Sequence, residues 1–216
     1  MNVFFLSHPA CLEHRAPMSH PECPERLGAI DDQLIASGIE PWVRHVEAPR
    51  ATREQLLRVH DASYLDALEA GVPAPGHWLT LDGGDTFFGE HSLEAALRAA
   101  GAVVHAVDLV MARDTHTAFC SVRPPGHHAG RDYGMGFCVF NNVAVGAAHA
   151  LAAHGLSRVA IVDFDVHHGN GTEDIFRDDP RVLFCSSFQH PFYPNLGADT
   201  PHNHILNLPL PRDTDG

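Results

Sequence analysis

Residues 159–171 read Val-Ala-Ile-Val-Asp-Phe-Asp-Val-His-His-Gly-Asn-Gly, an apolar run that leads into a polar cluster. The apolar residues 159–162 predict a buried strand, and the polar residues follow at its carboxyl end. Because side chains alternate along an extended chain, Asp163, Asp165 and His167 are expected on one face. Two carboxylates and an imidazole at such a strand end predict a divalent metal site.

A second polar cluster, Arg123-Pro124-Pro125-Gly126-His127-His128, follows another strand-like run at 117–122. Pro-Pro-Gly predicts a tight and stiff loop. Rigid placement of two adjacent imidazoles is what a positioned acid–base pair requires. We therefore expect the two clusters to face one common hollow, close enough to share a hydrolytic water.

The rest of the chain alternates between strand-like and helical patterns, which predicts a single α/β domain with an open, mostly parallel sheet buried on both faces and flanked by helices. Strands are expected at 2–7, 43–47, 117–122, 158–163, 182–187 and 204–208. Helices are expected at 24–37, 52–59, 61–70, 91–112, 140–154 and 172–177. The segments 71–90 and 188–203 are rich in Gly, Pro, His and Asp and read as loops.

The composition argues against several classes of function. The net charge is −13 and all 14 basic residues are Arg, which argues against direct binding of nucleic acid and removes Schiff-base chemistry by Lys. The acidic surface either steers cationic substrates or serves solubility alone. Five cysteines without a C-x-x-C pair indicate reduced thiols. With no signal peptide and no apolar stretch of roughly 20 residues, the sequence predicts a cytoplasmic protein that does not enter membranes.

Several motifs occur in the order found in the histone deacetylase family, and the chain most resembles the class II branch and bacterial deacetylase-like amidohydrolases. The motifs lie at His20–Leu27, Val59–Leu65, Arg123–His128, Gly136–Asn142 and Asp163–Gly171. The resemblance covers nearly the whole chain. It implies the arginase/deacetylase fold and zinc-dependent hydrolysis of an acetylated amine, with an acetyl-lysine protein or peptide, or an acetylated small amine, as the substrate partner. Fe²⁺ is the alternative to zinc as the catalytic metal. Whether the protein forms a homo-oligomer is left open.

The resemblance also implies roles for the polar clusters. Asp165 and His167 correspond to two protein ligands of the zinc ion. His128 corresponds to the general base and His127 to its partner, with Asp163 beside His127 and Asn170 beside His128. A carboxylate raises the pKa of a neighbouring imidazole, whereas a neutral amide fixes its tautomer without that effect. The pair is thus expected to be split into one charged and one neutral imidazole.

Further sites follow from the same resemblance. A structural K⁺ ion is implied near Asp163, Asp165, His167, Ser186 and Ser187. The acyl-lysine channel would be lined by Gly136, Phe137 and Tyr193, with Asp85 at its rim. Arg26 would lie in an internal pocket that receives the leaving acetate.

One departure from the family limits these expectations. The third zinc ligand of the family, an Asp, and its oxyanion-stabilising Tyr both lie downstream of the strand at 206–209, and residues 1–216 contain neither. We therefore expect residues 1–216 to be an incomplete catalytic domain, about its N-terminal two thirds, since catalytic zinc ordinarily has three protein ligands. Two alternatives stay open: an amidohydrolase acting on acetylated polyamines or other small amides, and a non-catalytic remnant or binding domain.

Overall fold

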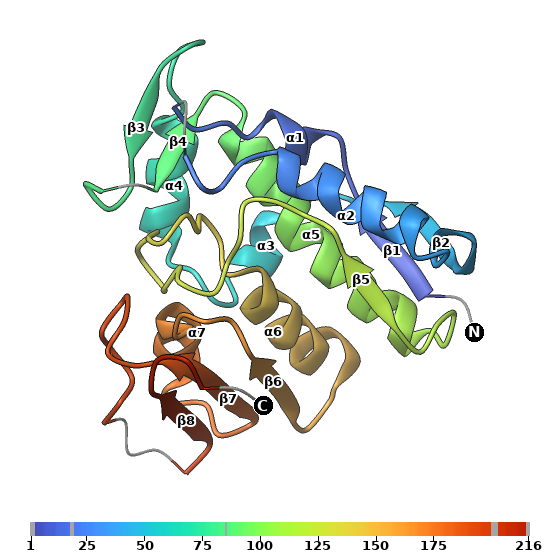
Figure 1. The fold of residues 1–216 in the computed structure, drawn as a ribbon. Helices are drawn as coiled ribbons and strands as arrows, with labels where there is room; N and C mark the ends of the chain where they lie inside the picture. Colours follow the sequence, from blue (N-terminus) through green and yellow to red (C-terminus); the bar gives the residue numbers. More distant parts are fainter. Residues whose placement is uncertain (1–2, 18–19, 85, 200–202, 215–216) are drawn as a thin grey trace.

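The computed structural model describes residues 3–17, 20–84, 86–199 and 203–214. Strands and helices alternate along the chain, as the sequence predicts (Figure 1). The strands are β1 (Val3–Ser7), β2 (Val43–Glu47), β3 (Trp78–Thr80), β4 (Phe87–Gly89), β5 (Ala118–Cys120), β6 (Val159–Asp163), β7 (Val182–Gln189) and β8 (Ile205–Leu210). The helices are α1 (Ala10–Glu13), α2 (Glu25–Ala36), α3 (Arg53–Leu56), α4 (Ala62–Ala70), α5 (Ser92–Met111), α6 (Asn142–His154) and α7 (Asn170–Phe176), with a 3-10 helix at Glu40–Trp42.

The first sheet has the parallel strand order β2-β1-β5. Its central strand β1 is buried on both faces. Phe4 and Leu6 pack against the alanines of α5, whereas Phe5 faces the other way and stacks on Phe119 with ring centroids 5.5 Å apart. A parallel strand covered on both sides reads as a continuous apolar run, which is why the sequence reveals β1 clearly.

The second sheet has the parallel order β6-β7-β8. The register places Asp163, the last residue of β6, beside Ser186 of β7. Along β7, Phe184, Ser186 and Phe188 are buried, while the residues between them are more open. The polar cluster after β6 therefore lies at the carboxyl end of a parallel sheet, as the sequence predicts.

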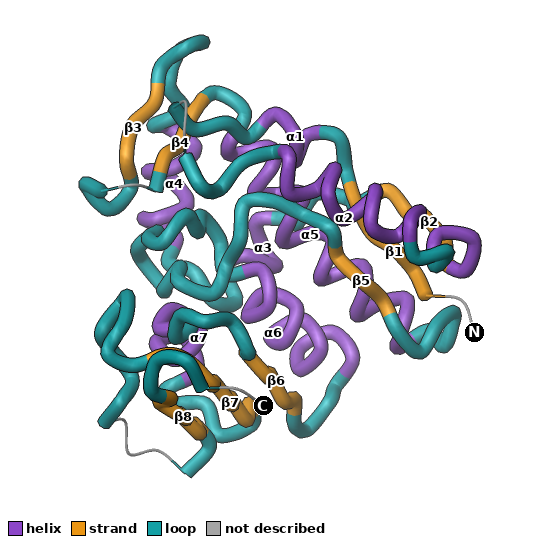
Figure 2. The backbone as a smooth tube through the Cα atoms, in the orientation of Figure 1, coloured by secondary structure: helices purple, strands orange, loops and turns teal. Residues whose placement is uncertain are grey.

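A groove separates the two sheets. Among the described residues, β5 pairs with β1 alone and β6 with β7 alone, and α5 and α6 lie behind the gap (Figure 2). The groove has a volume of about 720 Å³ and is lined from α5, β5, α6 and β6. On its β6 side, Val162 and Phe164 are 69% and 86% exposed. The mostly parallel arrangement is confirmed, but burial on both faces is wrong for β6, since Ile161 is buried on one face while Ala160 and Val162 are exposed on the other.

Helices α5 and α6 form the packed layer behind both sheets. Periodicity predicts a helix at 91–112, and α5 runs from Ser92 to Met111. Its buried face consists largely of alanines, so α6 can approach closely. At Gly146 of α6, an added Cβ would lie 2.5 Å from Cγ1 of Val103. This close helix pair fixes where the start of α6 lies relative to the loop that carries the two adjacent histidines.

Neither α1 nor the 3-10 helix at Glu40–Trp42 was predicted from the sequence, and two segments that were assigned also differ from the prediction. The segment 71–90, expected to be a loop, contains the antiparallel hairpin β3-β4. Its strands have three residues each, which is too short for a period-two pattern to show. The helix expected at 52–59 is shortened to α3, which begins with a capping box between Thr52 and Gln55.

Within the described ranges, no helix combines the length and the apolar character that crossing a membrane requires. All five cysteines are free; Cys11 and Cys138 are buried and the others are partly buried. Reduced thiols stay a prediction, with which this arrangement agrees.

Candidate active site

The loops after β5 and β6 meet at the carboxyl ends of the two sheets. Nδ1 of His127 lies 2.9 Å from Oδ2 of Asp163, and its Nε2 lies 3.9 Å from Oδ2 of Asp165. The rings of His128 and His167 have centroids 5.9 Å apart. The expectation that both polar clusters face one hollow is therefore confirmed.

Backbone hydrogen bonds from the start of α7 connect the two loops. The backbone N–H groups of Gly171 and Thr172 donate to the carbonyl of His127 at 3.0 and 3.1 Å. Gly171 is required for this approach, because an added Cβ would lie 2.2 Å from the carbonyl oxygen of Ala129. The Gly-Asn-Gly end of the motif thus positions the two adjacent imidazoles through the backbone.

Asp163 is ionised beside His127. Burial raises the pKa of Asp163, but the hydrogen bond and the positive charge of His127 lower it by more, so the pKa lies below its ordinary value. Oδ1 of the same carboxylate accepts from the backbone N–H of Asp165 at 3.1 Å. Asp163 therefore positions both the ring of His127 and the turn that follows β6 through hydrogen bonds.

His128 has a different environment. Its Nδ1 lies 2.7 Å from Oδ1 of Asn170, and the ring is 3% exposed. Burial, followed by the charge of His127, lowers the pKa of His128 to about 3. The amide nitrogen of Asn170 donates to Tyr133 Oη and Met135 Sδ, both at 3.4 Å, so Oδ1 is the atom that accepts from His128. His128 is thus a neutral imidazole whose Nε2 is free of the proton.

Asp165 and His167 provide one carboxylate and one imidazole at the open side of this hollow. Oδ2 of Asp165 lies 3.0 Å from Nδ1 of His167 and accepts from its backbone N–H at 2.8 Å. Both side chains are partly exposed. Their spacing is close to the roughly 3.4 Å between two ligand atoms that zinc bonds of about 2.1 Å and a tetrahedral angle imply. The residues fit a zinc ion as two of its ligands.

Two of the expected channel residues, Gly136 and Tyr193, lie against His128. Gly136 has φ +55°, and an added Cβ would lie 2.3 Å from Cδ2 of His128. Tyr193 presents its ring edge-on to His128, with centroids 5.2 Å apart. Phe137 also has a left-handed backbone, with φ +71°, and its N–H donates to Oγ1 of Thr86 at 3.0 Å. Asp85, predicted at the rim, lies outside the described residues.

A buried ion pair that was not predicted from the sequence supports the loop that carries the two histidines. Arg123 is fully buried and donates through Nε and Nη2 to the carboxylate of Glu22 at 2.5 and 2.6 Å. Its Nη1 donates to the carbonyl of Cys11 at 2.6 Å. The signal in the sequence was the position of Arg123 directly before Pro-Pro-Gly, together with an acidic residue in the His20–Leu27 motif.

The remaining predicted residues lie nearby but in other contacts. Nη2 of Arg26 donates to the carbonyl of Val122 at 2.6 Å, and burial lowers the pKa of this guanidinium. Oγ of Ser186 lies 3.0 Å from Nδ1 of His168, a fully buried ring that also contacts Glu173. The acetate pocket at Arg26 and the potassium site that includes Ser186 and Ser187 stay predictions.

Solved structures show the class of fold. The crystal structure of the HDA15 HD domain superposes on this chain with a TM-score of 0.87 and 34% sequence identity, covering 97% of this chain and 63% of that one. The fold is therefore the arginase/deacetylase fold.

Sequence comparison shows the family. The model of the histone deacetylase domain matches residues 20–216. A histone deacetylase-like amidohydrolase of Pseudomonas aeruginosa is 41% identical over 90% of this chain and 52% of its own length. The polyamine deacetylase HDAC10 of Rattus norvegicus is 40% identical over 83% of this chain and 32% of its own. This chain belongs to the histone deacetylase family of hydrolases. It spans 15%, 68% and 50% of three further curated relatives.

Proposed function

We propose that this chain is the N-terminal part of a zinc-dependent deacetylase that hydrolyses an acetylated amine, with the acetyl-lysine side chain as the preferred substrate. The observation that carries the proposal is the meeting of the two strand ends. It brings together an imidazole hydrogen-bonded to Asp163, a neutral imidazole and the Asp165–His167 pair. Metal-assisted amide hydrolysis uses a base for water, an acid for the leaving amine and a Lewis acid, and these groups would supply the first two and bind the third.

Asp165 and His167 would hold the zinc ion, which lowers the pKa of water and polarises a carbonyl group. Neutral His128 accepts the proton of the attacking water at Nε2, since Asn170 occupies its Nδ1, and then donates that proton to the leaving amine. His127, hydrogen-bonded to Asp163, stabilises negative charge that develops on the substrate. Gly136, Phe137 and Tyr193 form the apolar wall along which the acyl-lysine chain enters, and Arg26 binds the departing acetate.

We infer that a segment outside residues 1–216 completes the domain by filling the groove between β5 and β6. Two parallel strand edges face the groove, and apolar side chains of β6 are open to it. His127, Asp163 and Asp165 also line it, so a strand seated there would end beside the metal ligands. Such a strand would end close enough to Asp165 and His167 to provide the expected third zinc ligand. The K⁺ ion near Ser186 belongs to the same proposal, as does a cytoplasmic location, which the free thiols support.

The test uses the full-length protein with an acetylated lysine peptide. We expect stoichiometric zinc by mass spectrometry and release of acetate. Replacement His128→Ala should abolish release while zinc stays bound. Replacement of Asp165 by Asn should remove both zinc and activity. A protein that binds no metal and releases no acetate would instead be the non-catalytic remnant.

A second candidate substrate is an acetylated polyamine. The net charge of −13 favours cationic small molecules, and the relative from Rattus norvegicus carries the name polyamine deacetylase. The same full-length protein separates the two substrates. A higher kcat/KM for an acetylated polyamine than for the peptide, falling steeply as salt is raised, would favour the polyamine.

A further inference from the structure

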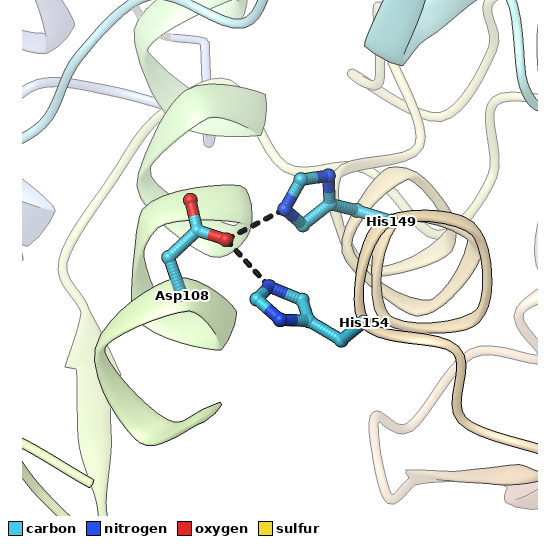
Figure 3. Close-up of side chains that lie close together, drawn as sticks. All are labelled: Asp108, His149 and His154. Atoms are coloured by element: carbon cyan, nitrogen blue, oxygen red, sulfur yellow. Dashed lines mark hydrogen bonds and ion pairs between the residues drawn. The ribbon is translucent and has the colours of Figure 1, made fainter. Parts of the chain in front are cut away.

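A cluster of two histidines and one aspartate lies outside the candidate active site. Asp108 belongs to the last turn of α5, and His149 and His154 belong to the second half of α6 (Figure 3). Nε2 of each histidine lies 2.7 Å from Oδ1 of Asp108. The three potential ligand atoms all lie within 4.8 Å of one another.

This cluster is remote from the strand ends. Helix α6 begins at Asn142, whose Nδ2 donates to the carbonyl of Pro124 in the loop before the adjacent histidines. At a rise of 1.5 Å per residue, His149 and His154 lie roughly 10 and 18 Å further along the helix. The proposed hydrolysis therefore does not use them.

We propose that Asp108, His149 and His154 bind a divalent transition-metal ion, with both Nε2 atoms and the carboxylate as ligands. Two imidazoles and one carboxylate suit zinc and its neighbours, whereas calcium and magnesium prefer oxygen ligands alone. The side chains of Asp108 and His154 are 44% and 26% exposed, so water can complete the coordination. The C-terminus of α6, which ends at His154 and is capped by Gly155, also favours a cation nearby.

Arg58 opposes metal binding and so lowers the affinity of this site for the metal ion. Its Nη1 lies 2.7 Å from Nδ1 of His149. Because a guanidinium only donates, Nδ1 accepts, and Nε2 carries the proton that it donates to Asp108. A metal ion on Nε2 requires that proton to leave or move to Nδ1, which ends the contact with Arg58. The guanidinium already reaches Glu54 at 3.2 Å, so it keeps a partner after release.

The test is a cobalt titration of full-length protein in which Asp165→Asn and His167→Gln disable the first metal site. We expect one Co²⁺ per chain with visible absorption bands of a low-coordinate nitrogen and oxygen site. His154→Gln should weaken binding by at least about tenfold. The matched control His116→Gln, in the loop after α5, should leave binding unchanged. Arg58→Met should tighten binding, because it frees Nδ1 of His149 to take the proton.

Equal cobalt binding by the parent and by His154→Gln would overturn the proposal and leave the cluster as a hydrogen-bonded tie between α5 and α6. A parallel measurement on zinc-loaded protein with its first metal site intact avoids dependence on the double variant. There, mass spectrometry should find one metal ion more in the unaltered protein than in His154→Gln. Equal metal content would likewise reject the site.

Discussion

Nδ1 of His128 donates to the amide oxygen of Asn170 at 2.7 Å, whereas its neighbour His127 faces the carboxylate of Asp163 at 2.9 Å. The two rings are only 4.0 Å apart between centroids. Two imidazoles so close cannot both be protonated without repulsion. The amide beside His128 leaves that ring neutral, whereas a carboxylate in its place would favour the protonated form.

Replacement Asn170→Asp should move the acidic limb of the pH–rate profile upward. A carboxylate favours the protonated form of the imidazole beside it, so the pKa of His128 rises and the base is blocked up to a higher pH. The measurement is kcat/KM against pH in the full-length enzyme. Asp179→Asn, a change at a surface pair with Arg181, serves as the control. An acidic limb that stays in place would contradict the division of roles between the two imidazoles.

Removing one partner of the buried ion pair Arg123–Glu22 should destabilise the protein strongly. Glu22→Gln leaves the guanidinium of Arg123 buried without its counter-charge, which typically costs about 3–5 kcal/mol in the free energy of unfolding. Denaturant unfolding of the full-length protein measures this. The exposed pair Arg53–Glu69 offers a matched comparison, because Glu69→Gln should change stability by less than about 1 kcal/mol. Similar losses of unfolding free energy in both variants would show that burial does not determine how much an ion pair contributes to stability.

The sequence predicted the strands of the two parallel sheets and the strand-end position of the two polar clusters because both depend on local pattern. Strand-like runs marked β5 and β6, and each polar cluster follows one of them at its carboxyl end. The boundaries of α5 followed from periodicity in the same way.

Other features depend on contacts between distant residues, which no local pattern reveals. Arg123 finds its partner Glu22 about a hundred positions away. The cluster at Asp108 forms only because α5 and α6 pack side by side. Strand-like alternation continued past Asp163 would place His168 on the same face as Phe164, yet His168 is fully buried and Phe164 is 86% exposed. The strand ends at Asp163, so alternation no longer applies to the residues that follow it.

Stability should fall as the pH drops below neutrality. Burial lowers the pKa of His14 and of His60 to about 4 each, below the ordinary value near 6.5. The unfolded chain therefore binds more protons between these values, and the stabilisation present above pH 6.5 is lost towards pH 4. We expect the urea midpoint to be flat above pH 7 and to decrease from pH 6.5 to 4. His60→Asn should flatten part of this slope, whereas exposed His116→Asn should not. Equal slopes in all three proteins would exclude the buried imidazoles as the cause.

Gly136→Ala should damage the site more than its backbone strain alone explains. Its φ of +55° disfavours any side chain, and the new Cβ would also lie 2.3 Å from the ring of His128. Gly38 provides the control, since it has φ +69° but no atom within 4 Å of an added Cβ. Both variants should lose roughly 1–2 kcal/mol of stability to backbone strain.

Gly136→Ala should in addition displace His128 and lower kcat by at least about a hundredfold, since an ångström of misplacement at a reacting group has that cost. Zinc content should stay unchanged, because neither Asp165 nor His167 is among the nearest atoms to the new methyl group. Steady-state kinetics and metal analysis of the two full-length variants, compared at equal folded fraction, separate strain from displacement. A kcat for Gly136→Ala equal to that of Gly38→Ala would mean that His128 tolerates the methyl group and that its position does not limit the reaction.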